Sequence, residues 1–367
     1  MNIVYLTNEY PPSSHGGIGN FIKEISESLV NLNNNVTVIG LYNFNKIEYI
    51  NGVKVIRIKK KKFPGSGIIN LFILRNFIKN YIIKNNIDIV EDNDWDLFSS
   101  ILFNINCKII LRIHNRNLAS YKNIYDMEIS RMIKLKLSLI NTNSIISVSK
   151  FIGSQLKRVL NDNNIDITNI YNGIYIENDF KNEITRKPYN LLFAGTLVEE
   201  KGIINLVKAW NVVLKENKNS VLHICGKDNN RKMENFLLSI VSDKNSLRFH
   251  GHVNKKKLYH LYKTCSGFIS PSYYEAFSLV PLESMSNACP TIYTKLSSGN
   301  EIIKNNHDGL LINPHDIKEI YESIIKIFKD KKFDKKIARN GFNKVKNHFE
   351  LKLITLQNLN HYKNLIK

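Results

Sequence analysis

Two glutamates in the second half of the chain have a spacing that could bind a sugar nucleotide. Glu275 and Glu283 stand eight residues apart in the stretch PSYYEAFSLVPLESMSNACPT, residues 271–291. Glu275 follows the apolar strand pattern GFIS, whereas Glu283 falls within a predicted helix that Pro281 helps to open at its first turn. One carboxylate on each side of a helix start suits hydroxyl groups on the two sugars of a nucleotide sugar. The alternative is an apolar helix with surface carboxylates.

The start of that helix is also a candidate phosphate site. The backbone amides of Phe277, Ser278 and Leu279 fall at the predicted helix N-terminus, where unpaired N–H groups and the helix dipole attract an anion. Helix N-termini are common and mostly empty, so these amides gain meaning only from the glutamates beside them. Together the residues predict a nucleotide-sugar site.

A lysine beside a glycine turn adds a candidate diphosphate contact. The stretch FAGTLVEEKGI places Gly195 at a strand end and Lys201 at the entrance to the next helix. A lysine there could reach a diphosphate as a point charge while helix amides hold the phosphate oxygens. Lysine and helix dipole together would stabilise a departing nucleoside diphosphate without a metal ion. A surface lysine is the alternative.

The first half of the chain offers a histidine and two aspartates at predicted strand ends. His114 follows the strand pattern KIILRI, with Arg112 and Arg116 on either side, and we expect it to contact substrate. A structural histidine is the alternative. Asp92 and Asp94 lie at the end of the pattern IDIVED and in the EDNDW stretch, where they could meet acceptor hydroxyls or lie in a solvated loop.

A glycine pair follows the first predicted strand. In SSHGGIGN, Gly16 and Gly17 let the backbone approach a ligand closely before the next helix starts. The loop does not match GxGxxG, and no acidic residue ends the second strand VTVIGLYN, where a ribose hydroxyl would need one. This pattern argues against a nicotinamide enzyme.

The elements that must position these residues alternate between strands and helices. Short apolar runs such as NIVYLT, KIILRI and GFISPS are typical of buried parallel strands. In the first predicted helix, six apolar residues share one face that would cover a sheet: Ile18, Phe21, Ile22, Ile25, Leu29 and Leu32. The predicted fold is α/β, with two Rossmann-like domains facing each other across a cleft and ligands beyond the carboxyl ends of the strands.

Length and a break in pattern predict the domain boundaries. A chain of 367 residues is too long for one compact core. Polar and charged residues with Pro188 interrupt the apolar pattern near residue 180. We therefore expect an N-terminal domain over residues 1–176, a linker over 177–189 and a C-terminal domain over 190–348. A helix over 349–367 is a candidate to pack back on the N-terminal domain.

Composition excludes several classes of protein. No apolar run is long enough to span a bilayer, and the N-terminus enters a strand pattern without a signal sequence, so we expect a cytoplasmic protein. The four cysteines, Cys107, Cys225, Cys265 and Cys289, are widely spaced and predict reduced, mostly buried thiols. His250 and His252 form an HxH pair without a third ligand nearby in sequence, so no metal site is expected.

The net charge of +20 points to an anionic partner. Nucleic acid is not expected, because the chain carries no recognition motif and no short module that interleaves basic and aromatic residues. A phosphate-bearing substrate or an acidic membrane at the inner cell surface fits as well. The run Lys59 to Lys62 and the basic and apolar helix around Arg131, Lys134 and Lys136 are candidate contacts; a solvated loop and an ordinary core helix are the alternatives.

Taken in order, these stretches resemble the retaining glycosyltransferases of the GT-B fold, the group often called family 4. The similar segments are GGIGNF, RIHN, SVSKFI, YNGI, FAGTLVEEKGI, FHGHV, EAFSLVPLE and GNEIIKNNHDGLLINPHD. They span nearly the whole chain. The resemblance implies hexosyl transfer with retention at the anomeric carbon, from a nucleoside diphosphate sugar to the hydroxyl of a saccharide or lipid-linked acceptor. Bacterial surface-polysaccharide or glycoconjugate assembly is the implied setting, and no cofactor is implied.

The resemblance also implies roles for single residues. Gly16 and Gly17 would lie near the donor diphosphate, and His114 would hydrogen-bond the transferred sugar. In the second half, Lys201 and the amides of Ser278 and Leu279 would bind phosphate. Glu275 would face the donor hexose, Glu283 would take the ribose hydroxyls, and the base would lie near His252 and Val253.

One position departs from the family pattern. The family usually has an arginine after the glycine of the phosphate-binding turn, and here that residue is Thr196. A hydroxyl donates one hydrogen bond but brings no charge, so the diphosphate would depend more on Lys201, or Arg116 would compensate. A nucleotide-sugar-binding protein without transferase activity therefore stays open. A sugar-nucleotide epimerase and a sugar phosphorylase are further alternatives, although no distinct site for a phosphorylase's phosphate or cofactor is evident.

Overall fold

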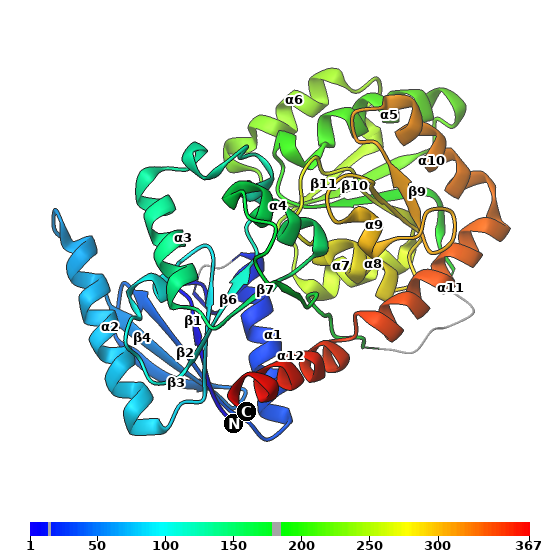
Figure 1. Ribbon diagram of the computed structural model, residues 1–367. Coiled ribbons are helices and arrows are strands. Elements are labelled where there is room, and N and C mark those ends of the chain that lie inside the picture. The colour runs from blue at the N-terminus through cyan, green and yellow to red at the C-terminus, as the bar shows by residue number, and fades with distance from the viewer. Residues whose placement is uncertain (14–15, 178–184) are drawn as a thin grey trace. The chain divides into compact units, whose positions relative to one another are not determined.

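The computed structural model describes residues 1–13, 16–177 and 185–367, with the backbone but not the side chain of Arg116. The chain divides into two compact units (Figure 1). Unit 1 comprises Met1–Gly173 and Leu351–Lys367, and unit 2 comprises Ile174–Glu350. The predicted boundaries were residues 176 and 349. Of the predicted linker 177–189, residues 178–184 lie outside the described residues, and residues 187–189 already belong to the first strand of unit 2.

Unit 1 contains an eight-stranded sheet with the order β3-β4-β2-β1-β5-β6-β7-β8. Its strands are β1 (Asn2–Leu6), β2 (Asn35–Tyr42), β3 (Lys46–Ile50), β4 (Val53–Lys59), β5 (Ile89–Asn93), β6 (Lys108–Ile113), β7 (Ser144–Ser147) and β8 (Thr168–Asn169). All neighbours run parallel except β3 and β4. The sequence did not predict β3, because this edge strand is largely exposed and its KIEYI pattern offers no continuous apolar run.

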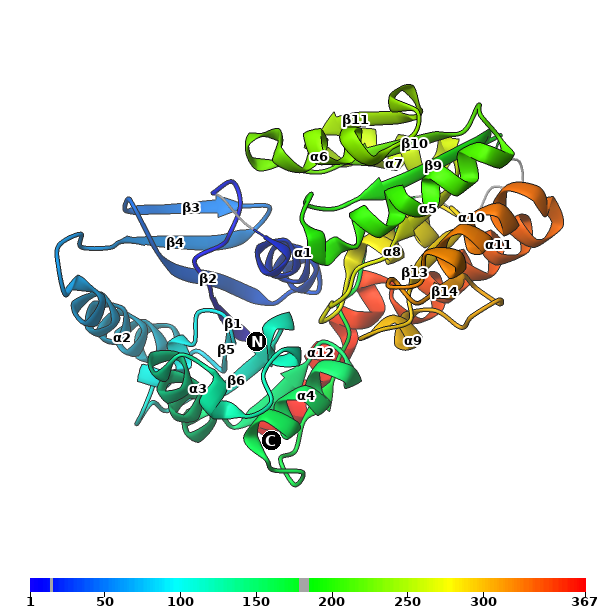
Figure 2. The same cartoon turned by 90° about the horizontal axis from the view of Figure 1, so that it is seen from above.

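Helices cover both faces of this sheet. They are α1 (Gly17–Asn31), α2 (Ser66–Asn85), α3 (Ile129–Asn141), α4 (Lys150–Leu160) and α12 (Leu351–Ile366), with short 3-10 turns η1 (Phe98–Ile101), η2 (Arg116–Ala119) and η3 (Ile124–Asp126). One core joins α1 and α12 to the sheet face that carries Ile3 and Tyr5. A second core joins α2 to the face that carries Val4 and Leu6. Figure 2 shows α2 and α3 next to each other in this unit.

The predicted core face of the first helix is confirmed. Phe21, Ile22, Ile25 and Leu29 are buried in α1, and Ile18 and Leu32 are partly buried against the same cluster. The helix of residues 351–366 belongs to the core of unit 1, where Ile354, Leu359 and Tyr362 are buried.

Unit 2 contains a six-stranded parallel sheet with the order β11-β10-β9-β12-β13-β14. Its strands are β9 (Lys187–Ala194), β10 (Val221–Cys225), β11 (Leu247–Gly251), β12 (Cys265–Ser270), β13 (Thr291–Thr294) and β14 (Leu310–Ile312). Its helices are α5 (Ile203–Glu216), α6 (Lys232–Ile240), α7 (Lys255–Thr264), α8 (Leu279–Ser286), α9 (Gly299–Ile302), α10 (Ile317–Lys329) and α11 (Lys331–His348), with 3-10 turns η4 (Glu199–Lys201), η5 (Asn229–Arg231) and η6 (Lys244–Ser246). The predicted α/β fold with two sheets is confirmed.

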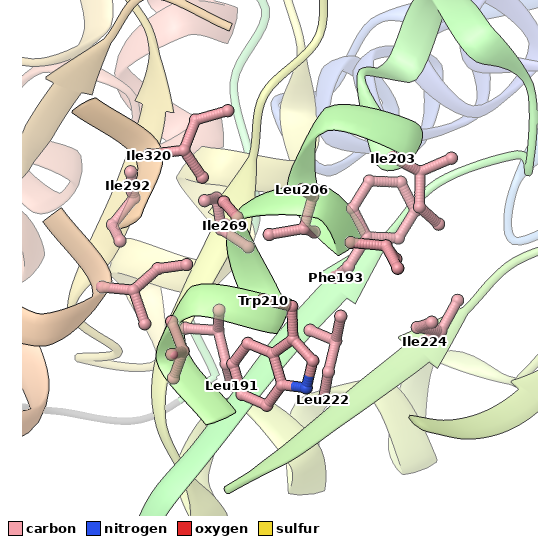
Figure 3. Close-up of a cluster of buried hydrophobic side chains, with 14 of the residues drawn as sticks. Leu191, Phe193, Ile203, Leu206, Trp210, Leu222, Ile224, Ile269, Ile292 and Ile320 are labelled. Carbon is pink, nitrogen blue, oxygen red and sulfur yellow. The ribbon is translucent and has the colours of Figure 1, made fainter. Parts of the chain in front are cut away.

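The larger core of unit 2 surrounds Trp210 of α5 (Figure 3). Leu191 and Phe193 of β9 and Leu222 of β10 project into it, and the indole N–H of Trp210 donates to Ser246 Oγ at 3.2 Å. Alternate residues of β9, Leu192 and Ala194, project into a second core against α7. Since both faces of β9 are covered, this strand is fixed in the centre of the sheet.

The structure bears on the predicted thiols and on the question of membrane-spanning helices. All four cysteines are free thiols; three are buried and Cys107 is half-buried. Within the described ranges, no helix is long and apolar enough to cross a bilayer.

Candidate active site

The unit 2 candidates gather at the point where the order of its sheet reverses. From the central pair β9 and β12, the chain proceeds to β10 and β11 on one side and to β13 and β14 on the other. Loops that leave two such strands flank the place at the carboxyl edge where open α/β sheets bind ligands in a crevice. Gly195 and Thr196 follow β9, and Glu275 follows β12.

Two backbone contacts fasten the loops after β9 and β12 together. Gly202 has a φ of +69°, and a Cβ atom there would lie 1.9 Å from the carbonyl oxygen of Pro271. The amide of Tyr273 donates to the carbonyl oxygen of Glu200 at 2.8 Å. Only glycine allows this approach, which brings Lys201 next to Glu275. This role of Gly202 was not predicted from the sequence, although the glycine that follows Lys201 in EEKGI was its signal.

Lys201 and Glu275 form an ion pair at this crevice. The Lys201 Nζ donates to Glu275 Oε1, and the side chains are 22% and 11% exposed. The Glu275 backbone N–H donates to Ser297 Oγ at 3.2 Å, which fixes the residue to the loop after β13. Burial and the neighbouring Glu275 carboxylate raise the pKa of Tyr293 well above its ordinary value, so that phenol stays protonated. The carboxylate therefore sits at a defined, partly solvated position.

Glycines let the adjoining turns pack closely. A Cβ atom at Gly226, after β10, would lie 1.7 Å from the Gly195 carbonyl oxygen, so the two strand ends meet backbone to backbone. The Lys201 side chain lies close to Gly195. A Cβ atom built at Gly195 would lie 3.8 Å from Lys201 Cδ, which is an ordinary van der Waals distance. Thr196 is exposed at the same turn, where the family pattern has an arginine.

The two glutamates lie in different surroundings around the start of α8. Phe277 and Ser278 are buried and Leu279 is half-buried at this helix start, with Ser278 as its N-cap residue. Glu283 is half-buried on α8, and its charge helps burial to raise the pKa of Tyr262 on α7. Glu275 instead neighbours Tyr293 of β13. This placement has the predicted form of one carboxylate on each side of a helix start.

The residues predicted to lie near the base, His252 and Val253, follow the edge strand β11. His252 is exposed, and Val253 packs partly buried against the α7 core. His250 turns to β10 instead, where its Nε2 lies 2.9 Å from His223 Nδ1 and the rings stack at 5.2 Å. Among the residues that the structure describes, no group of three or more His, Cys, Asp or Glu side chains could hold a metal ion.

In unit 1, His114 follows β6 at the carboxyl edge. Its backbone N–H donates to Asp94 Oδ1 at 2.8 Å, and its ring lies 5.1 Å from that of Phe21. Burial and the charge of Arg112 hold the pKa of His114 well below its ordinary value, so the imidazole is neutral at neutral pH. A neutral imidazole can both donate and accept a hydrogen bond, as a contact with a sugar hydroxyl requires.

The two aspartates have structural partners in place of the predicted acceptor contacts. Both are almost fully buried. Asp94 accepts from the amides of His114 and Asn115, so it shapes the loop that carries the histidine. Asp92 accepts from the amide of Ser99 at 2.6 Å. Burial raises the pKa of Asp92 to about 8 and that of Asp94 to about 6. An acceptor cannot reach carboxylates that are covered in this way.

The glycine pair of unit 1 lies at the start of α1. Gly16 and Gly17 are exposed, but the Gly16 amide already donates to Glu9 Oε2 at 3.0 Å. A donor phosphate would have to replace that carboxylate at this amide. Ser14 and His15 lie outside the described residues, and so does the Arg116 side chain that was expected to compensate for Thr196.

Comparison with protein families decides the class of this site. Residues 15–178 match the model of Glycosyltransferase Family 4, and residues 175–344 match the model of Glycosyl transferases group 1. The chain belongs to this glycosyltransferase family. An uncharacterized glycosyltransferase of Methanocaldococcus jannaschii, MJ1607, is 27% identical over 99% of this chain and 98% of its own length. The capsular polysaccharide biosynthesis glycosyltransferase CapM of Staphylococcus aureus is 24% identical over 60% of this chain and 61% of its own.

Solved structures of glycosyltransferases share the fold. Sucrose-phosphate synthase from Thermosynechococcus elongatus superimposes with a TM-score of 0.84 at 19% identity, covering 100% of this chain and 99% of that chain. HepE from Anabaena, in complex with UDP-glucose, gives a TM-score of 0.77 at 15% identity, covering 99% and 100%. The two-sheet architecture of this glycosyltransferase is therefore the GT-B fold that the sequence predicted.

Proposed function

We propose that this glycosyltransferase moves a hexosyl unit from a nucleoside diphosphate sugar to an acceptor hydroxyl, with retention at the anomeric carbon. The observation that carries the proposal is the Lys201–Glu275 ion pair beside the start of α8, at the reversal point of the unit 2 sheet. Family membership supports the reaction class. The complexes of HepE with UDP and with UDP-glucose make uridine diphosphate glucose the first donor to test.

Unit 2 supplies the donor contacts in this proposal. An ammonium has three N–H donors, and the bond to Glu275 uses one, so Lys201 has donors to direct at a diphosphate. The amides at the start of α8 add a second positive partner. Glu275, fixed through Ser297, accepts from hydroxyls of the hexose, and Glu283 accepts from the ribose. The base lies beside His252 and Val253.

The reaction balances without a protein nucleophile. The bond between the anomeric carbon and the leaving phosphate oxygen breaks, and the acceptor oxygen forms its bond on the same face. The acceptor proton passes to the leaving phosphate oxygen. Lys201 stabilises the charge that develops on the departing diphosphate, and His114 of unit 1, held neutral, hydrogen-bonds the transferred sugar. Because this charge comes from lysine and helix amides, removal of metal ions with EDTA is expected to leave transfer unchanged.

The proposed acceptor is a saccharide or a lipid-linked saccharide in surface-polysaccharide or glycoconjugate assembly. The name of CapM, a capsular polysaccharide biosynthesis enzyme, supports that setting. The proposed location is the cytoplasm.

The first experiment is thermal stabilisation of the purified protein by a panel of nucleoside diphosphates and their sugars. A ligand at about 100 times its dissociation constant adds roughly 2.7 kcal/mol to the free energy of unfolding. We expect one base to stabilise selectively, and that donor then enters transfer assays. If no nucleotide shifts the unfolding temperature, the proposal is wrong.

Thr196 favours a second candidate, a nucleotide-sugar-binding protein without transfer. In that case the donor stabilises the protein, but neither transfer nor hydrolysis follows. An epimerase would interconvert the donor without any acceptor. The variant Thr196→Arg restores the charge of the family pattern, and we expect it to tighten donor binding by about tenfold, the equivalent of about 1.4 kcal/mol. Thr196→Val, which adds no charge, is the matched control.

A further inference from the structure

An outward stripe of apolar side chains on α3 has no role in the donor site. Ile129, Ile133, Leu137 and Ile140 recur at intervals of four, four and three residues, so they share one side of the helix. They are 70%, 49%, 43% and 78% exposed. The inward side of the helix buries Leu135 and Ser138. This helix therefore exposes one apolar stripe to solvent, while Leu135 and Ser138 on its other side are buried.

The start of α2 also exposes apolar side chains. Phe63, Ile68, Ile69 and Phe72 are all exposed there. Both α2 and α3 pack on η1, and Figure 2 shows them side by side in unit 1. We call the eight side chains of these two paragraphs the α2–α3 surface: Phe63, Ile68, Ile69, Phe72, Ile129, Ile133, Leu137 and Ile140.

The two segments that carry the α2–α3 surface are basic. Residues 59–85 contain seven lysines and arginines and no aspartate or glutamate. Residues 129–141 contain three, Arg131, Lys134 and Lys136, and again no acidic residue. The acidic side chains nearest in sequence to α3 are Asp126 and Glu128, just before it. Long basic side chains can lay their stems on apolar surface while their charges reach phosphate groups.

We propose that the α2–α3 surface docks into the interface of an anionic lipid bilayer. A helix with one apolar stripe and flanking cations lies in such an interface with the stripe among acyl chains and the cations at the headgroups. The lysine run at 59–62 by itself would bind only through charge, and salt would abolish that binding. The apolar stripe adds a contribution that salt does not screen. The proposal does not depend on the donor site, so the failure of either leaves the other intact.

Vesicle flotation tests the proposal on the full chain. Wild type is expected to float with vesicles of phosphatidylcholine and phosphatidylglycerol and to retain part of this binding at about 0.5 M NaCl. Weaker flotation is expected with phosphatidylcholine alone. The double variant Ile133→Gln/Ile140→Gln should bind about tenfold or more weakly, because two exposed isoleucines no longer enter the apolar layer.

A matched control lies on the other face of the same sheet. Leu356 and Ile366 of α12 are 38% and 40% exposed, and Leu356→Gln/Ile366→Gln should float like wild type. Replacing Lys60, Lys61 and Lys62 by Gln should weaken binding at low salt more than at high salt. Circular dichroism and thermal unfolding check that each variant is folded, which is expected because all substituted residues are exposed.

Tryptophan fluorescence gives a second readout. The chain has two tryptophans, and Trp210 is fully buried in unit 2. Trp95 is 51% exposed, and the guanidinium carbon of Arg131 lies 5.5 Å from the centre of its ring, at the first turns of α3. A blue shift of emission with anionic vesicles is therefore expected from Trp95 and supports docking.

Three outcomes of the flotation assay would overturn the proposal. They are equal flotation of wild type and Ile133→Gln/Ile140→Gln, no flotation of wild type with anionic vesicles, and binding that salt abolishes completely. If sedimentation velocity instead shows a dimer that the double variant lacks, the surface joins two copies of this chain and the bilayer assignment is wrong.

Discussion

Two ion pairs, one in each unit of this glycosyltransferase, differ in burial and in the number of their partners. In unit 1, the Glu91 carboxylate holds the buried Arg112 guanidinium through two bonds, at 2.6 and 3.2 Å, and also accepts from the Tyr362 hydroxyl at 2.5 Å. In unit 2, Lys201 meets Glu275 through one bond at a partly solvated crevice. A buried charge network with many partners holds a fold together, whereas a partly solvated pair with unused donors can exchange partners with a ligand.

The largest expected effect comes from breaking the buried network of unit 1. Glu91→Gln leaves the Arg112 charge in the core without its carboxylate and should lower the free energy of unfolding by about 3–5 kcal/mol. Urea denaturation measures this loss. In the matched exposed pair, Glu216→Gln opposite Lys329 should leave the urea midpoint unchanged. Equal midpoints for Glu91→Gln and wild type would remove the distinction between the units.

The counterpart in unit 2 should affect turnover more than stability. Lys201→Ala removes the charge proposed to stabilise the leaving diphosphate, so kcat/KM should fall by about 10²–10³. The unfolding free energy should stay within about 0.5 kcal/mol, because the side chain is partly exposed. Lys329→Ala, which breaks an ion pair on α10, is the control. A similar loss of turnover in both variants would contradict the assigned role.

Gly202→Ala sharpens the comparison by testing what holds the unit 2 pair in place. The added Cβ would meet the Pro271 carbonyl and force the loops after β9 and β12 apart. We expect a loss of about 1–3 kcal/mol in unfolding free energy, together with weaker donor binding. Gly65→Ala is the matched control, since its φ of +79° is equally unfavourable while its Cβ would meet no atom within 4 Å. If both variants bind donor equally, the fastening of the loops does not matter.

The smallest effect concerns pH and the buried Asp92 of unit 1. Its pKa rises from 3.8 to about 8 through burial, so the folded protein keeps the proton over a range in which the unfolded chain has lost it. The stability that this proton contributes is complete below pH 3.8 and is lost as pH rises towards 8. Asp92→Asn should therefore show a shallower fall in unfolding free energy over this range, by about 1 kcal/mol or more. Asp162→Asn at the exposed Asp162 should follow wild type; identical slopes in all three would contradict the expectation.

Most of the fold could be predicted from the sequence because its strands are buried on both faces. Apolar runs such as NIVYLT and KIILRI record that burial directly. The exposed edge strand β3 lacks such a run and was missed. Sheet order does not follow from apolar pattern, so the pairing of β9 with β12, which defines the crevice, became evident only in the structure.

The sequence indicated positions for the candidate site, and the roles of these residues stay predictions. Lys201, Glu275 and Glu283 follow from strand ends and a helix start. Asp92 and Asp94 were misjudged, because sequence does not distinguish a carboxylate that faces solvent from one that accepts backbone amides inside a loop. Their partners come from segments that are distant in sequence or hidden in a turn.

The position of α12 has a consequence for the synthesis of the protein on the ribosome. Unit 1 takes its first 173 residues from one end of the chain and Leu351–Lys367 from beyond unit 2. Tyr362 of this returning segment donates to Glu91, and Asn358 accepts from Arg112. During translation, unit 1 can therefore be completed only after unit 2 has emerged. Until then, Glu91 and Arg112 of the nascent chain lack Tyr362 and Asn358 as hydrogen-bond partners. A message interrupted between the codons for residues 351 and 358 would leave this pair without either partner in a chain that already contains all of unit 2.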